Sequence, residues 1–132
     1  MITFGTHYLL SIAQQEREKV RAFYTRLLGC TLHSSDGGVT NNIPPTVDLF
    51  EFAGHEIVGV QYVDDPSLVL TQDGHRRGCW MELKTDDIPS LKQKLLDLGV
   101  QQITDFWDQE HFYFHAPGGQ VYRLIHTQEG TA

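Results

Sequence analysis

Four residues in the second half of the chain combine charge with aromatic surface: Trp80, Glu82, Tyr113 and Arg123. Trp80 and Glu82 alternate with apolar residues in a predicted strand, so both side chains belong to one face of a sheet. A hairpin that turns at 117–119 places Tyr113 opposite Arg123. Glu82 beside Arg123 would either bind a polar or anionic ligand or form a pair kept only for packing. Both interpretations stay open, and we expect an ion pair in either case.

Histidines and cysteines do not show the spacing of a metal site. Cys30 and Cys79 lie far apart in apolar strand sequence, which favours two buried free thiols over a disulfide or a redox pair. His111 and His115 lie two strand repeats apart on one predicted hairpin. A metal pair is conceivable there, although partly exposed histidines beside a turn are the commoner case.

Composition excludes several classes of function. The 132 residues are 40% hydrophobic and 20% charged, as in a globular protein, and the formal net charge is −7. Nucleic-acid binding needs clustered Lys and Arg, which this acidic chain lacks. No apolar run approaches the roughly 20 residues of a membrane span, and the N-terminus shows no signal-peptide pattern. We therefore expect a cytoplasmic protein with no nucleic-acid or membrane partner.

The first half of the chain reads as strand, helix and three strands. The helix over 16–28 has an apolar stripe that includes Val20, Phe23 and Leu27, and Gly29 is placed to end it. A loop over 34–45 is rich in Gly, Asn and Pro. The predicted strands are 6–12, 30–33, 46–52 and 56–63.

The second half repeats this order. Asp87 is placed to cap a helix over 88–98, and Leu98-Gly99 ends it as Leu28-Gly29 ends the first. The predicted strands are 79–85, 100–107, 110–115 and 120–127. The sequence therefore predicts an α+β fold: one domain of two βαβββ modules, about 1–63 and 78–127, joined by a linker at 64–77.

Three segments resemble one known family. They are His7 to Ile12 with Phe23-Tyr24 and Leu28-Gly29, the stretch from Trp80 to Ile88, and Phe114-His115-Ala116-Pro117-Gly118-Gly119 running on to Leu124. Together they are similar to the vicinal-oxygen-chelate superfamily of glyoxalases, extradiol dioxygenases and bleomycin-resistance proteins. The resemblance covers nearly the whole chain and implies two modules that form a pair of half-barrels.

The resemblance also implies a divalent metal held by four residues, usually His and Glu. His7 matches the first ligand position, and the second falls among Val58, Gly59 and Val60, which cannot coordinate. The third aligns with Trp80, or with Gly78 after a shift. The fourth aligns with Arg123, whose fixed positive charge repels a cation. The usual metal site is therefore not expected, although a divalent metal at a displaced site remains possible.

A concave site with aromatic walls and a few polar groups is the usual form of a small-molecule pocket. With Glu51 taken as the counterpart of Tyr113, we expect the half-barrel pocket to be lined by His7, Glu51, Trp80, Glu82, Tyr113 and Arg123.

Two functions fit these residues. The first is a metal-independent homodimer, similar to the bleomycin-resistance branch, that sequesters a small aromatic or amphipathic compound. The second is a lyase, isomerase or dioxygenase with a displaced metal site around His7, Glu51 and Glu82, whose catalytic residues the sequence does not identify. Loss of most ligand positions favours the first.

Overall fold

The computed structural model describes residues 1–36, 42–65, 79–104 and 106–128. Most of the predicted linker at 64–77, together with Gly78 and part of the loop at 34–45, lies outside these residues. The chain divides into two compact units, Met1–Val69 and Leu70–Ala132, called here the first and second modules. No helix in the described residues is long and apolar enough to span a membrane.

Each module contains one four-stranded sheet and one main helix. In the first module the elements are β1 (His7–Ala13), a 3₁₀ turn (Gln14–Glu16), α1 (Arg17–Ala22), a π-helical turn (Phe23–Leu27), β2 (Thr31–Ser34), β3 (Val47–Glu51) and β4 (Ile57–Val63). In the second they are β5 (Trp80–Thr85), α2 (Ile88–Leu98), β6 (Gln101–Ile103), β7 (Tyr113–His115) and β8 (Val121–His126).

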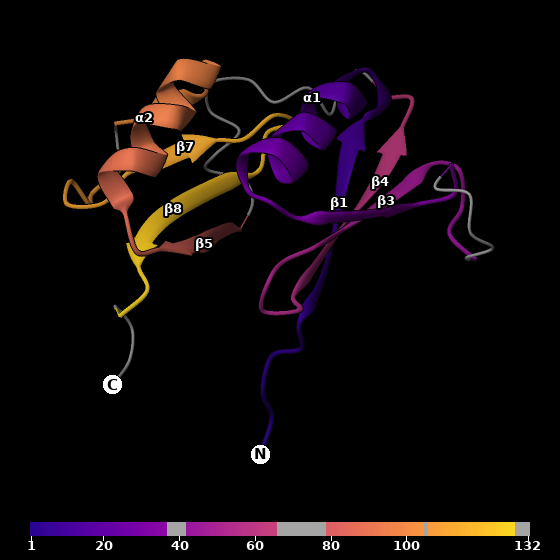
Figure 1. Ribbon diagram of the computed structural model, residues 1–132, viewed down its shortest axis with the longest axis horizontal. Coiled ribbons are helices and arrows are strands. Elements are labelled where there is room, and N and C mark those ends of the chain that lie inside the picture. The colour runs from indigo at the N-terminus through magenta and orange to yellow at the C-terminus, as the bar shows by residue number, and fades with distance from the viewer. Residues whose placement is uncertain (37–41, 66–78, 105, 129–132) are drawn as a thin grey trace. The chain divides into compact units, whose positions relative to one another are not determined.

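The two sheets have the same topology. Their strand orders are β1-β4-β3-β2 and β5-β8-β7-β6. In each sheet the first strand of the module pairs in parallel with the last, and the other neighbours are antiparallel. Each helix lies across its own sheet (Figure 1). The predicted α+β fold of two βαβββ modules is confirmed.

The helix of the first module packs through the predicted stripe. Val20, Phe23 and Tyr24 are fully buried, and the Tyr24 ring stacks on Phe50 of β3 with 4.7 Å between centroids. Because side chains alternate along a strand, Phe50 marks the helix-covered face of this sheet. The opposite face is called the open face in both modules.

The helix of the second module begins and ends at the predicted residues. Asp87 caps it, because its carboxylate accepts a hydrogen bond of 3.1 Å from the Ser90 amide. Gly99 ends it with a φ of 92°, a conformation that residues with a Cβ rarely adopt. Leu95 is buried on the sheet side, where Phe114 and Tyr122 are also buried.

Three local predictions need correction. The helix predicted over 16–28 is divided, because the backbone changes to π-helical hydrogen bonding at Phe23. The strands predicted over 100–107 and 110–115 shrink to β6 and β7, since the segment between them turns to contact Tyr113 through Phe106. Cys30 is buried, as expected, and burial raises the pKa of its thiol to about 12, but Cys79 is exposed.

Candidate functional site

The open face of the second module carries the predicted aromatic and charged residues. In the register, Glu82 pairs with Arg123, which in turn pairs with Tyr113, so the three side chains form one row across β5, β8 and β7. Trp80 precedes them by one strand repeat on the same face, and its ring meets the Tyr113 ring edge-on at 5.8 Å. The four residues therefore share one face of the sheet, as their alternation in the sequence predicted.

Arg123 and Glu82 form the expected ion pair. The Arg123 Nε donates to Glu82 Oε2 at 3.2 Å, and a terminal nitrogen of the guanidinium donates to the same oxygen. The guanidinium carbon lies 4.6 Å from the centre of the Trp80 ring, a cation–π distance. Arg123 is thus held by a carboxylate and by an aromatic face together.

The sequence analysis missed Asp108, which lies between β6 and β7 and is the second carboxylate of this cluster. Its Oδ2 accepts hydrogen bonds from the Tyr113 hydroxyl at 2.9 Å and from Arg123 at 3.4 Å. The same oxygen lies 2.9 Å from His111 Nδ1. The Asp108 side chain is only 7% exposed. Asp108 therefore ties its loop to the open face of the sheet.

The charges of this cluster are fixed by its contacts. Burial alone would raise the pKa of Asp108, but hydrogen bonds from the Glu110 amide, Tyr113 and His111 outweigh burial and lower that pKa to about 2. For Arg123, burial disfavours the charge, yet the bonds to Glu82 and Tyr113 raise the net pKa above its ordinary value. Burial raises the pKa of Tyr113. Near neutral pH the cluster therefore contains an ionised carboxylate, a guanidinium and a neutral phenol.

These residues do not fit the divalent metal that the resemblance implies. Arg123 occupies the fourth ligand position, and its guanidinium fills the space between Glu82 and Asp108 with a fixed positive charge. The indole of Trp80, at the third position, has no lone pair to offer a metal. No group of three or more His, Cys, Asp or Glu suited to a metal ion is found among the residues that the structure describes.

The other two predicted pocket residues belong to the first module. His7 and Glu51 share the open face of its sheet, because both pair with Ile57 of β4. His7 is exposed. Glu51 is bridged by two histidines: His33 Nε2 lies 2.9 Å from one carboxylate oxygen, and His55 Nδ1 lies 3.0 Å from the other. These two contacts, His55 first, lower the pKa of Glu51.

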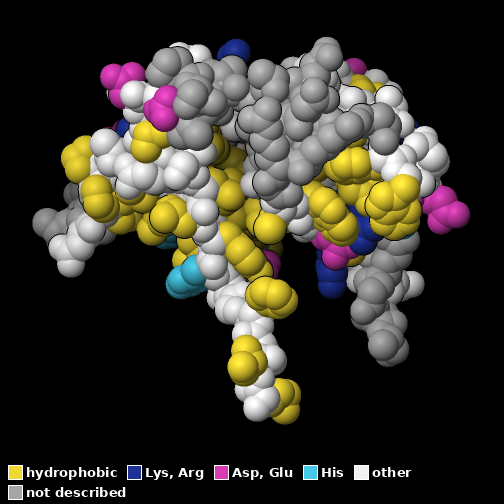
Figure 2. Space-filling view, turned by 180° about the vertical axis from the view of Figure 1, so that it is seen from behind, with side chains coloured by type: hydrophobic (Ala, Val, Ile, Leu, Met, Phe, Trp, Pro, Cys, Tyr) yellow, Lys and Arg dark blue, Asp and Glu magenta, His cyan; other side chains and the backbone are white. Residues whose placement is uncertain are grey.

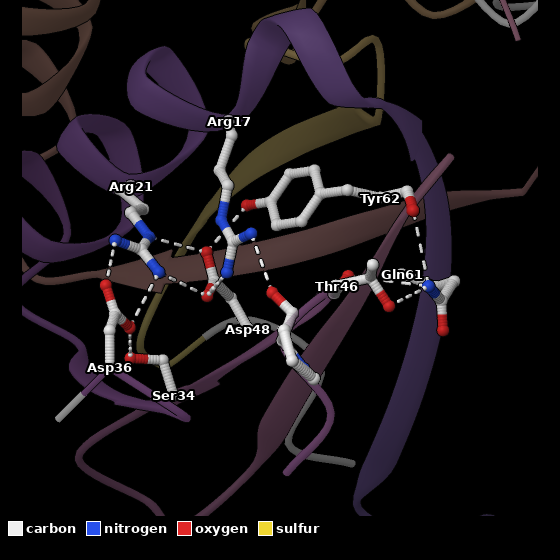
Figure 3. Close-up of polar contacts among 9 residues, drawn as sticks. Arg17, Arg21, Ser34, Asp36, Thr46, Asp48, Gln61 and Tyr62 are labelled. Carbon is white, nitrogen blue, oxygen red and sulfur yellow. Dashed lines mark hydrogen bonds and ion pairs between the residues drawn. The ribbon is translucent and has the colours of Figure 1, made fainter. Parts of the chain in front are cut away.

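A separate polar cluster lies on the helix-covered face of the first module, and the sequence analysis missed it as well. The carboxylate of Asp48 on β3 is fully buried and accepts hydrogen bonds from Arg17 at 2.9 Å and from Arg21 at 2.8 Å (Figure 3). The Tyr62 hydroxyl donates to it at 2.9 Å. Burial would raise the pKa of Asp48, but these donors lower it overall. The only sequence signal was the spacing of the two arginines, one helical turn apart.

The comparisons with known proteins identify the fold. No protein-family model and no curated protein sequence matches the chain. Among solved structures, a possible glyoxalase from Bacillus cereus is similar at a TM-score of 0.65 with 15% identity, covering 94% of this chain and 99% of that one. The fosfomycin resistance protein FosX from Listeria monocytogenes is similar at 0.64 with 14% identity, covering 96% and 94%.

A member of the glyoxalase/bleomycin resistance protein/dioxygenase superfamily from Sphaerobacter thermophilus is similar at a TM-score of 0.58 with 22% identity, covering 95% of this chain and 98% of that one. A mutant of the Listeria FosX was crystallised with Mn(II) and 1S,2S-dihydroxypropylphosphonic acid. The likeness extends over nearly the full length of each chain. The chain therefore has the fold of the glyoxalase/bleomycin resistance/dioxygenase superfamily, as its sequence motifs indicated.

Proposed function

We propose that this chain binds a small molecule without a divalent metal of the kind with which a FosX mutant was crystallised. The observation that carries the proposal is the position of Arg123, which aligns with the acidic ligand implied by the resemblance and is held by Glu82, Asp108 and Tyr113. A guanidinium fixed by these contacts provides a rigid, charged base for a binding site. It also makes coordination of a divalent metal ion at the position of the guanidinium itself unfavourable, since the two positive charges would repel.

The surroundings of Arg123 support binding rather than packing alone. Trp80 is 40% exposed and the Glu82 side chain is also 40% exposed. The pair is partly open to solvent beside an aromatic ring, so a ligand can reach both the carboxylate and the indole. Ligand sites commonly combine an aromatic wall with a few polar groups in this way.

We propose further that the protein works as a homodimer. β1 and β5 are edge strands of their sheets, and such edges are usually covered in native proteins. Large apolar side chains are also exposed: Leu9 on β1 is 69% exposed, and those of the N-terminal segment stand out in yellow in Figure 2. Light scattering at micromolar concentration tests this proposal, and a monomeric mass would contradict it.

A thermal-shift screen tests the binding function. A panel of small aromatic and amphipathic compounds is added to the purified protein, with and without Mn, Ni, Zn or Fe salts. We expect hits whose shifts do not depend on metal and are reduced in Trp80→Ala. Metal analysis of the untreated protein is the second arm. Stoichiometric metal, with hits only in its presence, would overturn the proposal in favour of an enzyme with a displaced site.

A further inference from the structure

We infer that the ligand of the second module's open face is an organic cation, with Glu82 as its charge partner and Trp80 as its stacking surface. This inference rests on the proposed binding function and adds the chemical class of the ligand. The ligand class follows from which polar groups of the cluster already have hydrogen-bond partners and which can accept further hydrogen bonds.

Arg123, the group that would attract an anion, already donates four hydrogen bonds within the cluster. Its Nε and one terminal nitrogen donate to Glu82 Oε2, and its other terminal nitrogen donates to Asp108 at 3.4 Å and to the Tyr113 hydroxyl at 3.2 Å. One face of the guanidinium lies over the Trp80 ring. An anionic ligand would have to displace a carboxylate that already neutralises this charge, so the exchange would gain little.

Asp108 is occupied as well. Its Oδ2 takes contacts from Tyr113, Arg123 and His111, and its Oδ1 accepts the Glu110 amide at 3.0 Å. With 7% of its side chain exposed, it has little surface left for a ligand. Asp108 therefore positions Arg123 and Tyr113 and is not the contact group.

Glu82 is the group with capacity left. Both bonds from Arg123 go to Oε2, and in the described part of the chain Oε1 receives no hydrogen bond. An ionised carboxylate can accept about four hydrogen bonds, so roughly half of its acceptor capacity is available. Because the side chain is 40% exposed, a ligand can reach it without unfolding the cluster. The unused group of this site is therefore a hydrogen-bond acceptor with a negative charge. Such a group favours ligands that donate hydrogen bonds or carry a positive charge.

Trp80 adds the aromatic half of the site. Its ring already carries the guanidinium at 4.6 Å, and 40% of the residue remains exposed. Indole rings attract cations more strongly than other aromatic side chains do, and a nearby carboxylate strengthens that attraction. Lys84, exposed one strand repeat beyond Glu82 on the same face, is the competing positive charge and provides a control.

Matched probes test the charge preference. Benzylammonium, benzyl alcohol and phenylmethanesulfonate share one ring and differ in charge, and the ammonium group can donate hydrogen bonds to Glu82. Binding to the full chain is followed by tryptophan fluorescence in a Trp107→Phe background, where the 87% exposed Trp107 no longer contributes and Trp80 is the reporter. We expect the cation to bind at least tenfold more tightly than the sulfonate. Glu82→Gln, which keeps an acceptor for Arg123, should weaken cation binding about tenfold.

The outcomes separate the two proposals. Lys84→Gln should leave cation affinity unchanged or raise it, while Trp80→Leu, followed by calorimetry, should weaken it. Binding of the sulfonate or the alcohol in preference to the cation would overturn the charge assignment and keep the binding function. Equal cation affinity in wild type and Glu82→Gln would also overturn the charge assignment and leave the binding function standing. If no probe and no compound of the thermal-shift panel binds, both proposals are wrong.

Discussion

The two modules share one topology but place their arginine–carboxylate clusters on opposite faces of the sheet. In the first module the carboxylate of Asp48 lies between sheet and helix, bound by Arg17 and Arg21. In the second module the helix-covered face is aromatic and aliphatic, and the charges of Arg123 and Glu82 lie on the open face. The same fold therefore supports either arrangement, provided that every buried charge is paired.

The matching rows of the two open faces show the same contrast. The central row of the second module is Glu82, Arg123 and Tyr113, whereas that of the first is Leu9, Gly59 and Leu49. The counterpart of Tyr113 is therefore Leu49, and the prediction that it is Glu51 was wrong by one strand repeat. An apolar row around a glycine offers no recognition chemistry, but a row with a half-exposed carboxylate does. The difference assigns a structural role to Asp48 and its two arginines, and it supports the binding role proposed above for the charges of the second module.

The buried charges of the first module also explain how its short helix is held. α1 has no side-chain N-cap, unlike α2, which Asp87 caps. Arg17 and Arg21 project from α1 to Asp48, and Arg17 also donates to the Pro45 carbonyl at 2.8 Å. These ion pairs fix the helix to its sheet where a cap is missing.

The largest expected effect is therefore in the first module. Asp48→Ala leaves Arg17 and Arg21 without their buried partner and leaves the Tyr62 hydroxyl unpaired, so we expect the free energy of unfolding to fall by about 3–5 kcal/mol. Urea unfolding followed by circular dichroism measures it. Asp36→Ala is the control, because Asp36 contacts the same Arg21 but its side chain is 62% exposed. A loss no larger than that of the control would refute the structural role of Asp48.

Acid sensitivity should arise in both modules. The pKa values of Asp48 and Asp108 are lowered in the folded state, so the stability they contribute is present above about pH 4 and is lost as pH falls. For Asp108 the window runs from about pH 4 to pH 2. We expect the free energy of unfolding of Asp108→Asn to fall less steeply across this window than that of the wild type. Parallel slopes in a urea series at different pH would contradict the assignment.

Strand alternation and glycine positions were enough to predict the fold and four of the five residues in the cluster of the second module, Asp108 being the exception. The alternation of Trp80 with Glu82 fixed the face, and the turn at Gly118 and Gly119, both with positive φ, fixed the pairing of Tyr113 with Arg123. Asp108 could not be found in this way. It lies in a segment with no periodic pattern, and its position depends on contacts that form only in the folded chain.

Asp48 was missed for a different reason. It alternates with Val47 and Leu49, a pattern that indicates a solvent-facing polar residue on β3, yet Asp48 shares the helix-covered face with Phe50 while Val47 and Leu49 lie on the open face. The ion pairs with Arg17 and Arg21 allow the polar Asp48 to lie on the buried, helix-covered face and not on the exposed one. Sequence patterning identifies the two faces of a strand, but the partners across the packed interface decide which face the helix covers.

Breaking the ion pair of the second module should have a smaller effect than breaking that of the first. Arg123→Ala leaves Asp108 without its cationic neighbour, but Arg123 is 19% exposed and Glu82 40% exposed, so solvent replaces part of the loss. We expect about 1–2 kcal/mol of destabilisation, less than for a fully buried pair. The double variant with Glu82→Gln should recover part of it, as a double-mutant cycle in urea would show. Additive losses would mean that the pair is not coupled.

The smallest effect is expected in the apolar row of the first module. A Cβ added at Gly59 would lie 3.1 Å from Leu49 Cδ2 and 3.2 Å from Leu9 Cδ1, closer than ordinary contact. Leu9 is 69% exposed and free to turn away, so Gly59→Ala should cost less than about 1 kcal/mol. Adding Leu9→Ala should remove part of that cost, because one of the two crowding atoms is gone, and urea unfolding of the four proteins of this cycle measures the coupling. A loss well above 1 kcal/mol that Leu9→Ala does not relieve would show that this row is tightly packed, and the contrast between the two open faces would then rest on charge alone.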